Sequence, residues 1–424
     1  MTGTTSQPAP DLIIIGASAR AACFSAARAG FAPYWLDQFG DSDLRAAFPG
    51  ALVSPVAYPA GLVSALEQAP HAPVIYTGAL ENHHRVLRHI AARRKLLGHS
   101  AEVCAAVRTP ALLRGRLAAH GLGFPNILTG GEHAPTHGRW LQKPVRSGGG
   151  LGISAASPGT HATPGHYLQE FMPGENFSAV FVAGEADVRL LGITRQLVGG
   201  ADFHAPAFSY CGSIGPVTPG PRVRTRWEEI GRVLAQEFGL RGLFGIDAIV
   251  RDDEVTVIEV NPRYTASVEV LEAALGVAAV ALHMSAWGVA DRGKYSDPYI
   301  ATHGKACLFA PTDLVFDQAA SELCHAPHGG NARNVQVQAM GSNVRGQSMR
   351  SDPCVGTSAR FADIPAPGTP IPRAAPILTV LCRADTLDAC AKLLRNMSEE
   401  VYKALGMAGS AYALARLTTD AASK

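Results

Sequence analysis

Residues 242–263 read Gly-Leu-Phe-Gly-Ile-Asp-Ala-Ile-Val-Arg-Asp-Asp-Glu-Val-Thr-Val-Ile-Glu-Val-Asn-Pro-Arg, and the rest of the chain is interpreted outward from them. Two β-rich runs flank a polar turn at 251–254, a pattern that predicts an antiparallel hairpin. With the turn centred near Asp253, Asp247 lies opposite Glu259. Asn261 projects from the same face as Glu259, because side chains alternate along a strand. We therefore expect two carboxylates and an amide oxygen on one face.

This polar face has the composition of a magnesium site. Opposed like charges destabilise a strand pair, by about 0.2 to 1 kcal/mol, and a divalent cation removes that repulsion. Oxygen ligands from one small platform leave much of the coordination sphere to water and phosphate, which is how Mg²⁺ is usually held. Arg263, after the rigid Pro262, is placed to contact a phosphoryl group or a substrate carboxylate. The alternative, a surface hairpin with solvated acids, leaves Asn-Pro-Arg unexplained.

A lysine beside a glycine-rich run forms the second motif. Residues 139–145 are predicted to form a strand that contains Lys143. The run that follows includes Ser147, Gly148, Gly149 and Gly150. One fixed cation next to bare backbone N–H groups suits phosphate binding. Because the lysine precedes the glycines, this is not a Walker A loop; a flexible linker is the alternative.

Residues 167–175, Tyr-Leu-Gln-Glu-Phe-Met-Pro-Gly-Glu, alternate as a strand and then break at Pro173. Phe171 and Met172 can line the apolar slot that an adenine ring requires. Taken singly, the stretch is equally typical of a strand whose Phe171 and Met172 are core residues. Its place between Lys143 and the hairpin favours a nucleotide site.

Asp247 and the run 259–263, Glu-Val-Asn-Pro-Arg, resemble the metal-binding end of the ATP-grasp superfamily. Within it, the sequence is most similar to the biotin-carboxylase-like carboxylate-amine ligases, a group that contains tyramine-glutamate ligases of methanofuran-type cofactor synthesis. The resemblance covers roughly residues 10–290. It implies an ATP-grasp fold in which Asp247, Glu259 and Asn261 hold Mg²⁺, for which Mn²⁺ can substitute.

The resemblance also implies roles along the nucleotide. Lys143 would contact the phosphates and the glycine run would cover them. Glu170 would accept a hydrogen bond from the adenine amino group, the backbone at Phe171 and Met172 would read the ring, and Glu175 would bind the ribose hydroxyls. The family's second phosphate cation lies upstream of this lysine. The chain offers only arginines there, and Arg108 is the favoured candidate.

The N-terminal region resembles a nucleotide fold. A buried strand at 11–15 leads through Gly16 into an alanine-rich helix, and the next strand ends at Asp37. Only one glycine of the dinucleotide fingerprint is present, so we favour a Rossmann-like domain without its cofactor, with NAD binding as the alternative. Glu81 and Asn82 follow a third strand, where they either contact the acceptor substrate or cap a helix.

The other elements follow from periodicity and turn residues. We expect helices at 107–122, 221–238, 268–287 and 387–405, a hairpin from 177–182 and 188–197, and a strand beginning at 305. Arg195 either neutralises phosphate or intermediate charge or is solvated. Ser267 and Glu269 are candidate substrate contacts, with helix capping as the alternative. The expected organisation is an α/β ATP-grasp protein with a Rossmann-like domain at 1–106, a core at 107–290 with a lid at 125–175, and a small β-rich C-terminal segment at 291–424.

Composition excludes several classes. The chain has 424 residues, 47% hydrophobic and 17% charged, which is typical of a globular protein of two or three domains. A net charge of +2 and the absence of a basic run argue against nucleic-acid binding. The 8 cysteines form no Cys-x-x-Cys pair. Neither a signal peptide nor a long apolar run is present, so we expect a cytoplasmic protein that does not bind a membrane; a homodimer is the base-rate expectation.

Together the motifs predict an ATP- and Mg²⁺-dependent ligase. A carboxylate would be phosphorylated to an acyl phosphate, and an amine or amino acid would attack it to form an amide, with release of ADP and phosphate. The resemblance points to one-carbon cofactor (methanofuran-like) biosynthesis. A biotin-carboxylase-like carboxylase and a non-catalytic nucleotide-binding scaffold are the alternatives.

Overall fold

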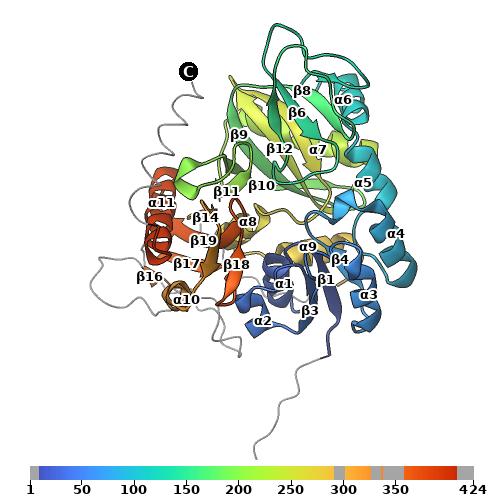
Figure 1. Cartoon of the computed structure of the whole chain (residues 1–424). Coiled ribbons are helices and arrows are strands. Elements are labelled where there is room, and N and C mark those ends of the chain that lie inside the picture. The colour runs from blue at the N-terminus through green and yellow to red at the C-terminus, as the bar shows by residue number, and fades with distance from the viewer. Residues whose placement is uncertain (1–8, 291–300, 326–335, 338–357, 408–424) are drawn as a thin grey trace, which may run out of the picture.

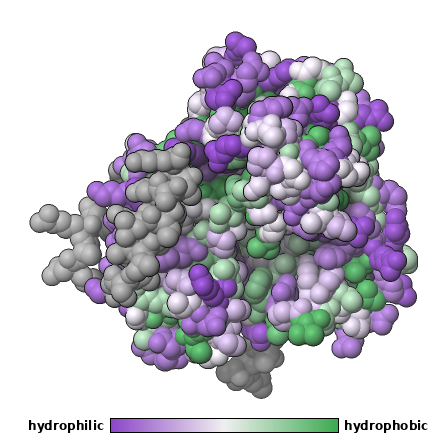
Figure 2. Space-filling view, turned by 45° about the horizontal axis from the view of Figure 1, so that its top comes forward, coloured by the Kyte–Doolittle hydropathy of each residue, from purple (hydrophilic) through white to green (hydrophobic). Residues whose placement is uncertain are grey.

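The computed structural model describes residues 9–290, 301–325, 336–337 and 358–407. The N-terminal residues form a small α/β unit beneath a larger unit built on one long sheet, and the C-terminal elements flank that sheet (Figure 1). On the face drawn in Figure 2, hydrophilic residues cover most of the upper part, and hydrophobic ones show mainly toward the middle.

The N-terminal unit is the predicted Rossmann-like domain. Its parallel sheet has the order β3-β2-β1-β4, formed by β1 Leu12–Gly16, β2 Pro33–Asp37, β3 Gly50–Leu52 and β4 Val74–Tyr76. The helices are α1 Arg20–Arg28, α2 Ser42–Ala47, α3 Gly61–Gln68 and α4 His84–Arg93, with a short 3₁₀ turn η1 at Leu80–Asn82. The fully buried run of β1 fits a parallel strand covered on both faces.

The larger unit is built on a nine-stranded sheet of order β13-β12-β9-β10-β11-β14-β19-β17-β16. Its first five strands are β9 Glu175–Ala183, β10 Val188–Val198, β11 Tyr210–Gly215, β12 Gly242–Arg251 and β13 Glu254–Asn261, with η2 Ala201–Phe203 before β11. Side-chain alternation in β9 separates two cores. Phe181 packs with α7 Pro221–Phe238, whereas Val182 packs with α9 Ala279–Ala286 and with α1 of the N-terminal unit.

Four of the C-terminal strands, β14, β19, β17 and β16, continue this sheet, whereas β15 and β18 pair with each other in a separate two-stranded sheet. β14 Thr302–Phe309 pairs with β11 on one side and with β19 Pro376–Ala384 on the other. The segment also contains β15 Leu314–Phe316, α10 Gln318–His325, β16 Gln336–Val337, β17 Ser358–Ala362, β18 Thr369–Ile371 and α11 Leu387–Ala404. The expected boundary at 291 therefore does not coincide with a boundary between sheets.

A separate four-stranded antiparallel sheet of order β5-β8-β6-β7 corresponds to the predicted lid. Its strands are β5 Ile127–Leu128, β6 Trp140–Pro144, β7 Ser154–Ala156 and β8 His166–Glu170. It has a small core of its own around Trp140 and Leu168.

Two predicted helices differ from those observed. The helix expected at 107–122 is observed as α6 Pro110–Ala119, which begins at Pro110 because proline is favoured in the first helical turn, and α5 Ala101–Val107 before it was not predicted. The helix expected at 268–287 is split into α8 Val268–Leu275 and α9, which are bent by 104°. Gly276 at the bend has a φ of 65°, which favours glycine.

Apart from that bent α8–α9 pair, which passes a test of length and composition alone, the described residues contain no helix long and apolar enough to cross a membrane.

Candidate active site

A β-bulge at Ile258 determines which side chains of the hairpin enter the site. The pairing runs Ala248–Val257 and then Asp247–Glu259, so Ile258 is the extra residue. Because of it, Val257 and Val260 both face the α7 core, while Glu259 is turned to the opposite face. The predicted pair of Asp247 and Glu259 is confirmed, although the hairpin turns at residues 252 and 253. Both turn residues have a positive φ, of 50° and 64°, as a tight two-residue turn requires.

The polar face of the hairpin holds Asp247, Glu259 and Asn261 together. Asn261 Nδ2 donates to Asp247 Oδ2 at 3.0 Å, and Gln196 Nε2 donates to Asp247 Oδ1 at 2.8 Å. Burial, followed by the charge of Glu259, raises the pKa of Asp247 to about 6. Burial also acts to raise the pKa of Glu259, but Arg108 and Lys143 lower it on balance. Of the two carboxyl groups, Glu259 therefore ionises at the lower pH, and Asp247 keeps its proton to a higher pH.

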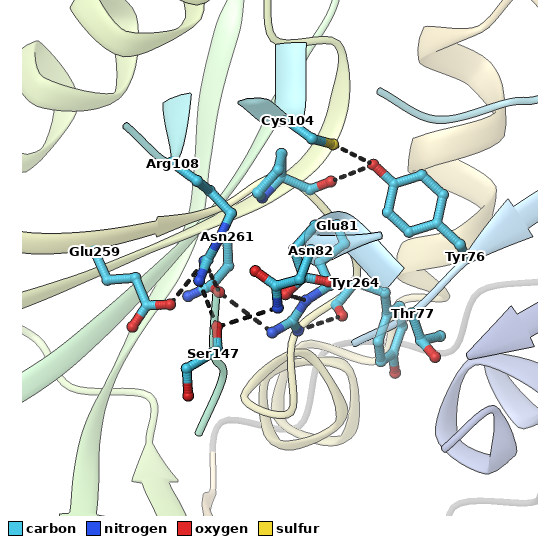
Figure 3. Close-up of polar contacts among 12 residues, drawn as sticks. Tyr76, Thr77, Glu81, Asn82, Cys104, Arg108, Ser147, Glu259, Asn261 and Tyr264 are labelled. Carbon is cyan, nitrogen blue, oxygen red and sulfur yellow. Dashed lines mark hydrogen bonds and ion pairs between the residues drawn. The ribbon is translucent and has the colours of Figure 1, made fainter. Parts of the chain in front are cut away.

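Three cationic side chains meet these acids. Arg108 Nη1 lies 2.7 Å from Glu259 Oε1, and its Nη2 donates to the Ser147 carbonyl (Figure 3). Arg263 Nη2 donates to Asn261 Oδ1 at 3.2 Å. Lys143 projects from β6 and is 8% exposed, and burial lowers its pKa because it disfavours the charged form.

The glycine-rich loop lies against the segment that precedes β11. Tyr210 N donates to the Gly149 carbonyl at 2.9 Å, and Ser147 Oγ donates to the Leu151 carbonyl at 2.5 Å. Gly150 has a φ of 79°, and a Cβ there would lie 1.9 Å from the carbonyl oxygen of Phe208. This approach of two backbones requires glycine at position 150.

A cavity of about 220 Å³ lies between the lid and the central sheet. A smaller one of about 40 Å³ lies beside it. The predicted residues that line the larger cavity are Lys143, Gly149, Gly150, Glu170, Phe171, Met172, Asp247, Glu259, Asn261 and Arg263. Arg108, Ser147 and Gly148 line the smaller one, together with Lys143, Gly150 and Glu259. The two motifs and the hairpin, separate in the sequence, thus surround one space.

A family model described as the ATP-grasp domain matches residues 111–267. Residues 111–267 form an ATP-grasp domain. The match spans the four-stranded sheet β5-β8-β6-β7, the glycine-rich loop and the β12–β13 hairpin. The fold expected from the sequence is therefore confirmed.

Curated relatives match the chain over limited segments. The formate-dependent phosphoribosylglycinamide formyltransferase of Methylococcus capsulatus is 35% identical over 136 residues, 28% of this chain and 34% of that protein. The tyramine–L-glutamate ligase of Methanocaldococcus jannaschii is 28% identical over 102 residues, 24% of this chain and 30% of that protein. The match thus spans about a third of the length of each relative.

Solved structures extend the likeness to the whole fold. Biotin carboxylase from Campylobacter jejuni has a TM-score of 0.64 at 14% identity, covering 91% of this chain and 90% of that one. L-amino acid ligase from Bacillus licheniformis has a TM-score of 0.62 at 14% identity, covering 93% and 98%. At such identities the likeness concerns the fold, including the N-terminal unit and the C-terminal strands.

The end of the ATP-grasp hairpin is anchored to the N-terminal unit. The Pro262 carbonyl accepts hydrogen bonds from Tyr76 Oη at 3.1 Å and from His99 Nδ1 at 2.8 Å. Both side chains are buried, and burial lowers the pKa of His99 to about 4, so the ring is neutral near pH 7. Figure 3 shows Tyr76 and Cys104 on this side of the site, with the Tyr76 hydroxyl 3.1 Å from Cys104 Sγ.

Two expectations about the ATP-grasp site change. Glu175 lines neither cavity; it lies 3.1 Å from Arg195, and both side chains are about half exposed, so its ribose contact stays a prediction. The Phe171 amide already donates to the Arg139 carbonyl, so it is not free to read the adenine edge.

Asp37 accepts from the amides of Ala19, Phe39 and Gly40, which removes the ribose ligand of the NAD alternative. Of the other candidates, Glu269 pairs with Arg20 and Lys305, whereas Ser267 lines the cavity.

Sequence reasoning missed Ser178, Gln196, Phe208 and Tyr210, all of which line the cavity. Ser178 had a usable signal: it is the one polar residue of the apolar run Phe177–Ala183, and it pairs with Asp247 in the sheet. Phe208 and Tyr210 lie in and just after an irregular loop, where no periodicity indicates which side chains face inward.

Proposed function

We propose that this protein is an ATP- and Mg²⁺-dependent ligase that joins a carboxylate to an amine through an acyl phosphate, releasing ADP and phosphate. The observation that carries the proposal is the convergence of Lys143, Arg108 and Arg263 with the acids Asp247 and Glu259 on one partly apolar cavity. Phosphoryl transfer depends on positioning and charge neutralisation, and it requires no nucleophilic side chain from the protein.

The nucleotide would lie with its base at the apolar end of the cavity. Leu141, Phe171, Met172 and Ile258 line that end, and Glu170 lies at its edge. Lys143 and Arg108 would then face the phosphates beneath the glycine-rich loop. The lowered pKa of Lys143 supports this role, because an anionic ligand relieves the cost of burying its charge.

The donor set fits a divalent cation. Burial, followed by the charge of Glu259, holds the pKa of Asp247 near 6, and a bound cation would offset both the burial of this carboxylate and its repulsion by Glu259. Asp247, Glu259 and Asn261 would hold Mg²⁺, or Mn²⁺ in its place. These three residues supply only part of a coordination sphere, and Mg²⁺ commonly takes its remaining ligands from phosphate and water.

The reaction balances without further reactants. A substrate carboxylate oxygen attacks the γ-phosphorus of ATP, and the bond to the β–γ bridging oxygen breaks to release ADP. The amine nitrogen then attacks the acyl carbon, phosphate leaves, and the nitrogen loses a proton. Bound Mg²⁺ would supply neutralisation of the phosphate charge. Arg263 would orient the carboxylate, since its guanidinium reaches the cavity beside Asn261.

The N-terminal unit offers a place for the amine. Arg263 Nε donates to Glu81 Oε1 at 2.7 Å, while the second oxygen, Glu81 Oε2, is buried and has no hydrogen-bond partner among the described residues. The Tyr58 hydroxyl is likewise buried and finds no partner in the described part of the chain, and the charges of Glu81 and Arg263 both act on it. An ammonium or amine group would satisfy these oxygens. We therefore assign the amine to this side of Arg263.

The finer assignment rests on the relatives. The tyramine–L-glutamate ligase suggests glutamate and a tyramine-like amine as candidate substrates, and with them a role in methanofuran-like cofactor synthesis. Because the chain matches about a third of that protein, these substrates are one hypothesis to screen.

The first test is a thermal-shift titration of the wild type, Lys143→Ala and Glu259→Gln. Binding to the folded state raises its stability, by about 2.7 kcal/mol at a hundredfold excess over Kd. We expect a shift that needs both ATP and Mg²⁺ and that weakens in both variants. Glu254→Gln, at the exposed tip of the same hairpin, is the matched control and should behave as wild type. Absence of any wild-type shift would refute nucleotide binding.

Product analysis then separates the remaining alternatives. ADP and phosphate formed only with a carboxylate and an amine support the ligase, whereas AMP and pyrophosphate contradict it. Bicarbonate-dependent ADP formation without an amine would indicate a carboxylase. Nucleotide binding without turnover on any carboxylate and amine pair would favour the scaffold.

A further inference from the structure

The cavity continues well beyond the metal hairpin. The strand order β12-β9-β10-β11 carries its lining from Asp247 past Ser178 and Gln196 to Val198 and Tyr210, and Val198 pairs directly with Tyr210. Three strand spacings of about 4.8 Å separate β12 from β11, roughly 14 Å across the sheet. A formate or bicarbonate ion beside Arg263 is too small to span this width.

The part of the extension next to Arg263 is polar. Thr265 Oγ1 and Ser267 Oγ are 3.0 Å apart, and Ser178 Oγ lies 3.4 Å from Ser267 Oγ. All three residues are buried and line the cavity. Hydroxyl donors beside a guanidinium suit a carboxylate, because both can hydrogen-bond to its oxygens and the cation offsets its charge.

The far part is apolar and aromatic. Val198, Phe208 and Tyr210 line it, and none of the described acidic residues that line the cavity lies on these elements. Tyr210 Oη has a partner in Ser213 Oγ at 2.9 Å, which leaves the ring as its contact surface toward the cavity. Such a wall suits a hydrocarbon or aromatic group.

Phe208 is held in this wall at a conformational cost. Its φ is 64°, in the left-handed region that a bulky residue rarely adopts. The Ser209 amide donates to the Pro206 carbonyl at 3.0 Å, and the Gly199 amide donates to the Ser209 carbonyl at 2.8 Å, so the turn is fixed on both sides. The Phe208 carbonyl faces Gly150, which couples this wall to the glycine-rich loop. Strain of this kind is concentrated at ligand-binding sites.

We propose that the acyl substrate is a carboxylate with an extended apolar or aromatic body. Its carboxylate meets Arg263 and the hydroxyls of Ser178, Thr265 and Ser267, and its body lies against Val198, Phe208 and Tyr210. The proposal rests on the ligase function proposed above and names its substrate class. It separates this chain from an enzyme that activates formate or bicarbonate.

The test traps the acyl phosphate with hydroxylamine, so the natural amine need not be known. The acyl phosphate and hydroxylamine give a hydroxamate and phosphate, and the hydroxamate is measured as its iron complex. The carboxylates are formate, bicarbonate, acetate, glutamate, 3-methylbutanoate and 3-phenylpropanoate, each with ATP and Mg²⁺. We expect kcat/KM for 3-phenylpropanoate or 3-methylbutanoate to exceed that for acetate by about tenfold or more, as apolar pockets discriminate by group size.

Substitutions test whether the apolar wall of Val198, Phe208 and Tyr210 produces the preference for larger carboxylates. Phe208→Ala should raise KM for 3-phenylpropanoate about tenfold and leave KM for acetate within about twofold. Tyr210→Phe keeps the ring and should retain the preference. Val315→Ala, on the exposed face of β15, is the matched control and should be unchanged. Equal or better activity with formate, bicarbonate or glutamate would overturn the proposal, as would a Phe208→Ala effect equal for every carboxylate.

Binding measurements keep this result distinct from failure of the ligase function. The same carboxylates are added in thermal-shift titrations, with and without a non-hydrolysable ATP analogue and Mg²⁺. A larger shift for 3-phenylpropanoate than for acetate, lost in Phe208→Ala, supports the pocket even if no hydroxamate forms. A thermal shift with the ATP analogue but with none of the carboxylates would contradict the proposed acyl-substrate pocket. It would still support nucleotide binding.

Discussion

Two buried groups of charges in this molecule differ in how completely they are paired. The first, the interdomain cluster, consists of Arg20, Asp43, Glu269, Lys305 and Asp363. Arg20 lies 2.5 Å from Asp363 and 2.8 Å from Glu269, and Lys305 lies 2.8 Å from Glu269. It joins α1 and α2 of the N-terminal unit to α8 and to the C-terminal segment.

In the interdomain cluster most groups favour their charged forms. Burial acts against this, but the partners raise the pKa of Arg20 and Lys305 and lower that of Glu269 and Asp363. Asp43 is the exception, because burial raises its pKa to about 6; it accepts hydrogen bonds from the amides of Asp363 and Ile364. These charges therefore act as structural ties.

The second group, the cavity cluster, consists of Arg108, Lys143, Asp247, Glu259 and Arg263. Arg108 and Glu259 satisfy each other, but Lys143 and Asp247 are shifted toward their neutral forms, chiefly by burial. The lesson is that burial alone does not mark a site. A buried cation and a buried acid whose pKa values are both shifted toward the neutral form are in a state that a charged ligand would relieve.

The largest effect on stability should come from Glu269→Gln. This change leaves the buried cations Arg20 and Lys305 without their shared counter-charge, so we expect the free energy of unfolding to fall by about 3 to 5 kcal/mol. Urea denaturation measures the loss. The folded protein should still give a thermal shift with ATP and Mg²⁺. A loss below about 1 kcal/mol would show that the interdomain cluster is not a structural tie.

Glu259→Gln should reduce activity more than stability, the reverse of what we expect for Glu269→Gln. It removes charge from the cavity cluster, so the rate of ADP formation should fall by about 10² to 10³ in kcat, or about 2.7 to 4 kcal/mol. Glutamine retains an oxygen that can accept from Arg108, so unfolding by urea should change less than in Glu269→Gln. Equal losses of stability in the two variants would remove the distinction between the clusters.

The binding of Mg²⁺ and ATP should depend on pH through Asp247. Its pKa in the folded protein, about 6, lies above the ordinary value, so the ligand-free protein holds a proton there more tightly than the unfolded chain does. Stability of the ligand-free protein therefore falls as pH rises from about 4 to 6. The metal competes with this proton, so its affinity should rise roughly tenfold between pH 5 and 7. Isothermal titration calorimetry measures this, and Asp247→Asn should abolish the pH dependence.

The smallest effect should come from an exposed pair. Arg222 and Glu254 lie 3.1 Å apart with side chains 75% and 63% exposed. Solvent screens such pairs, so Arg222→Ala should change the free energy of unfolding by less than about 1 kcal/mol in urea denaturation. A larger loss would mean that pairing in general, and not burial with pairing, stabilises this fold.

Local pattern predicted much of the fold. Strand alternation placed Asp247 opposite Glu259, and the helix at 221–238 ends as expected at Phe238, with Gly239 in the left-handed conformation. The errors occurred where a single residue changed the local backbone geometry. Pro110 shifted the start of one predicted helix, and Gly276 divided another. The bulge at Ile258 was also not predicted, because one inserted residue leaves no mark on the hydrophobic pattern.

The candidate site was predicted in part for the same reason. Lys143 and the glycine run are adjacent in the chain, so their chemistry could be read together. The pairing of Glu81 with Arg263 joins residues 182 positions apart, and that of Arg108 with Glu259 joins residues 151 apart. No periodicity indicates contacts at such separations, so Arg108 was chosen only by resemblance.

The sequence by itself determined which residues carry the chemistry and which secondary structure holds them, because hydrogen-bond periodicity and side-chain alternation act between near neighbours. Tertiary structure alone decided how these pieces face one another. It placed Arg108 on Glu259, Phe208 on the glycine-rich loop and β14 in the central sheet. Those contacts depend on how whole sheets and units pack, and packing is settled by shape and buried area summed over many residues.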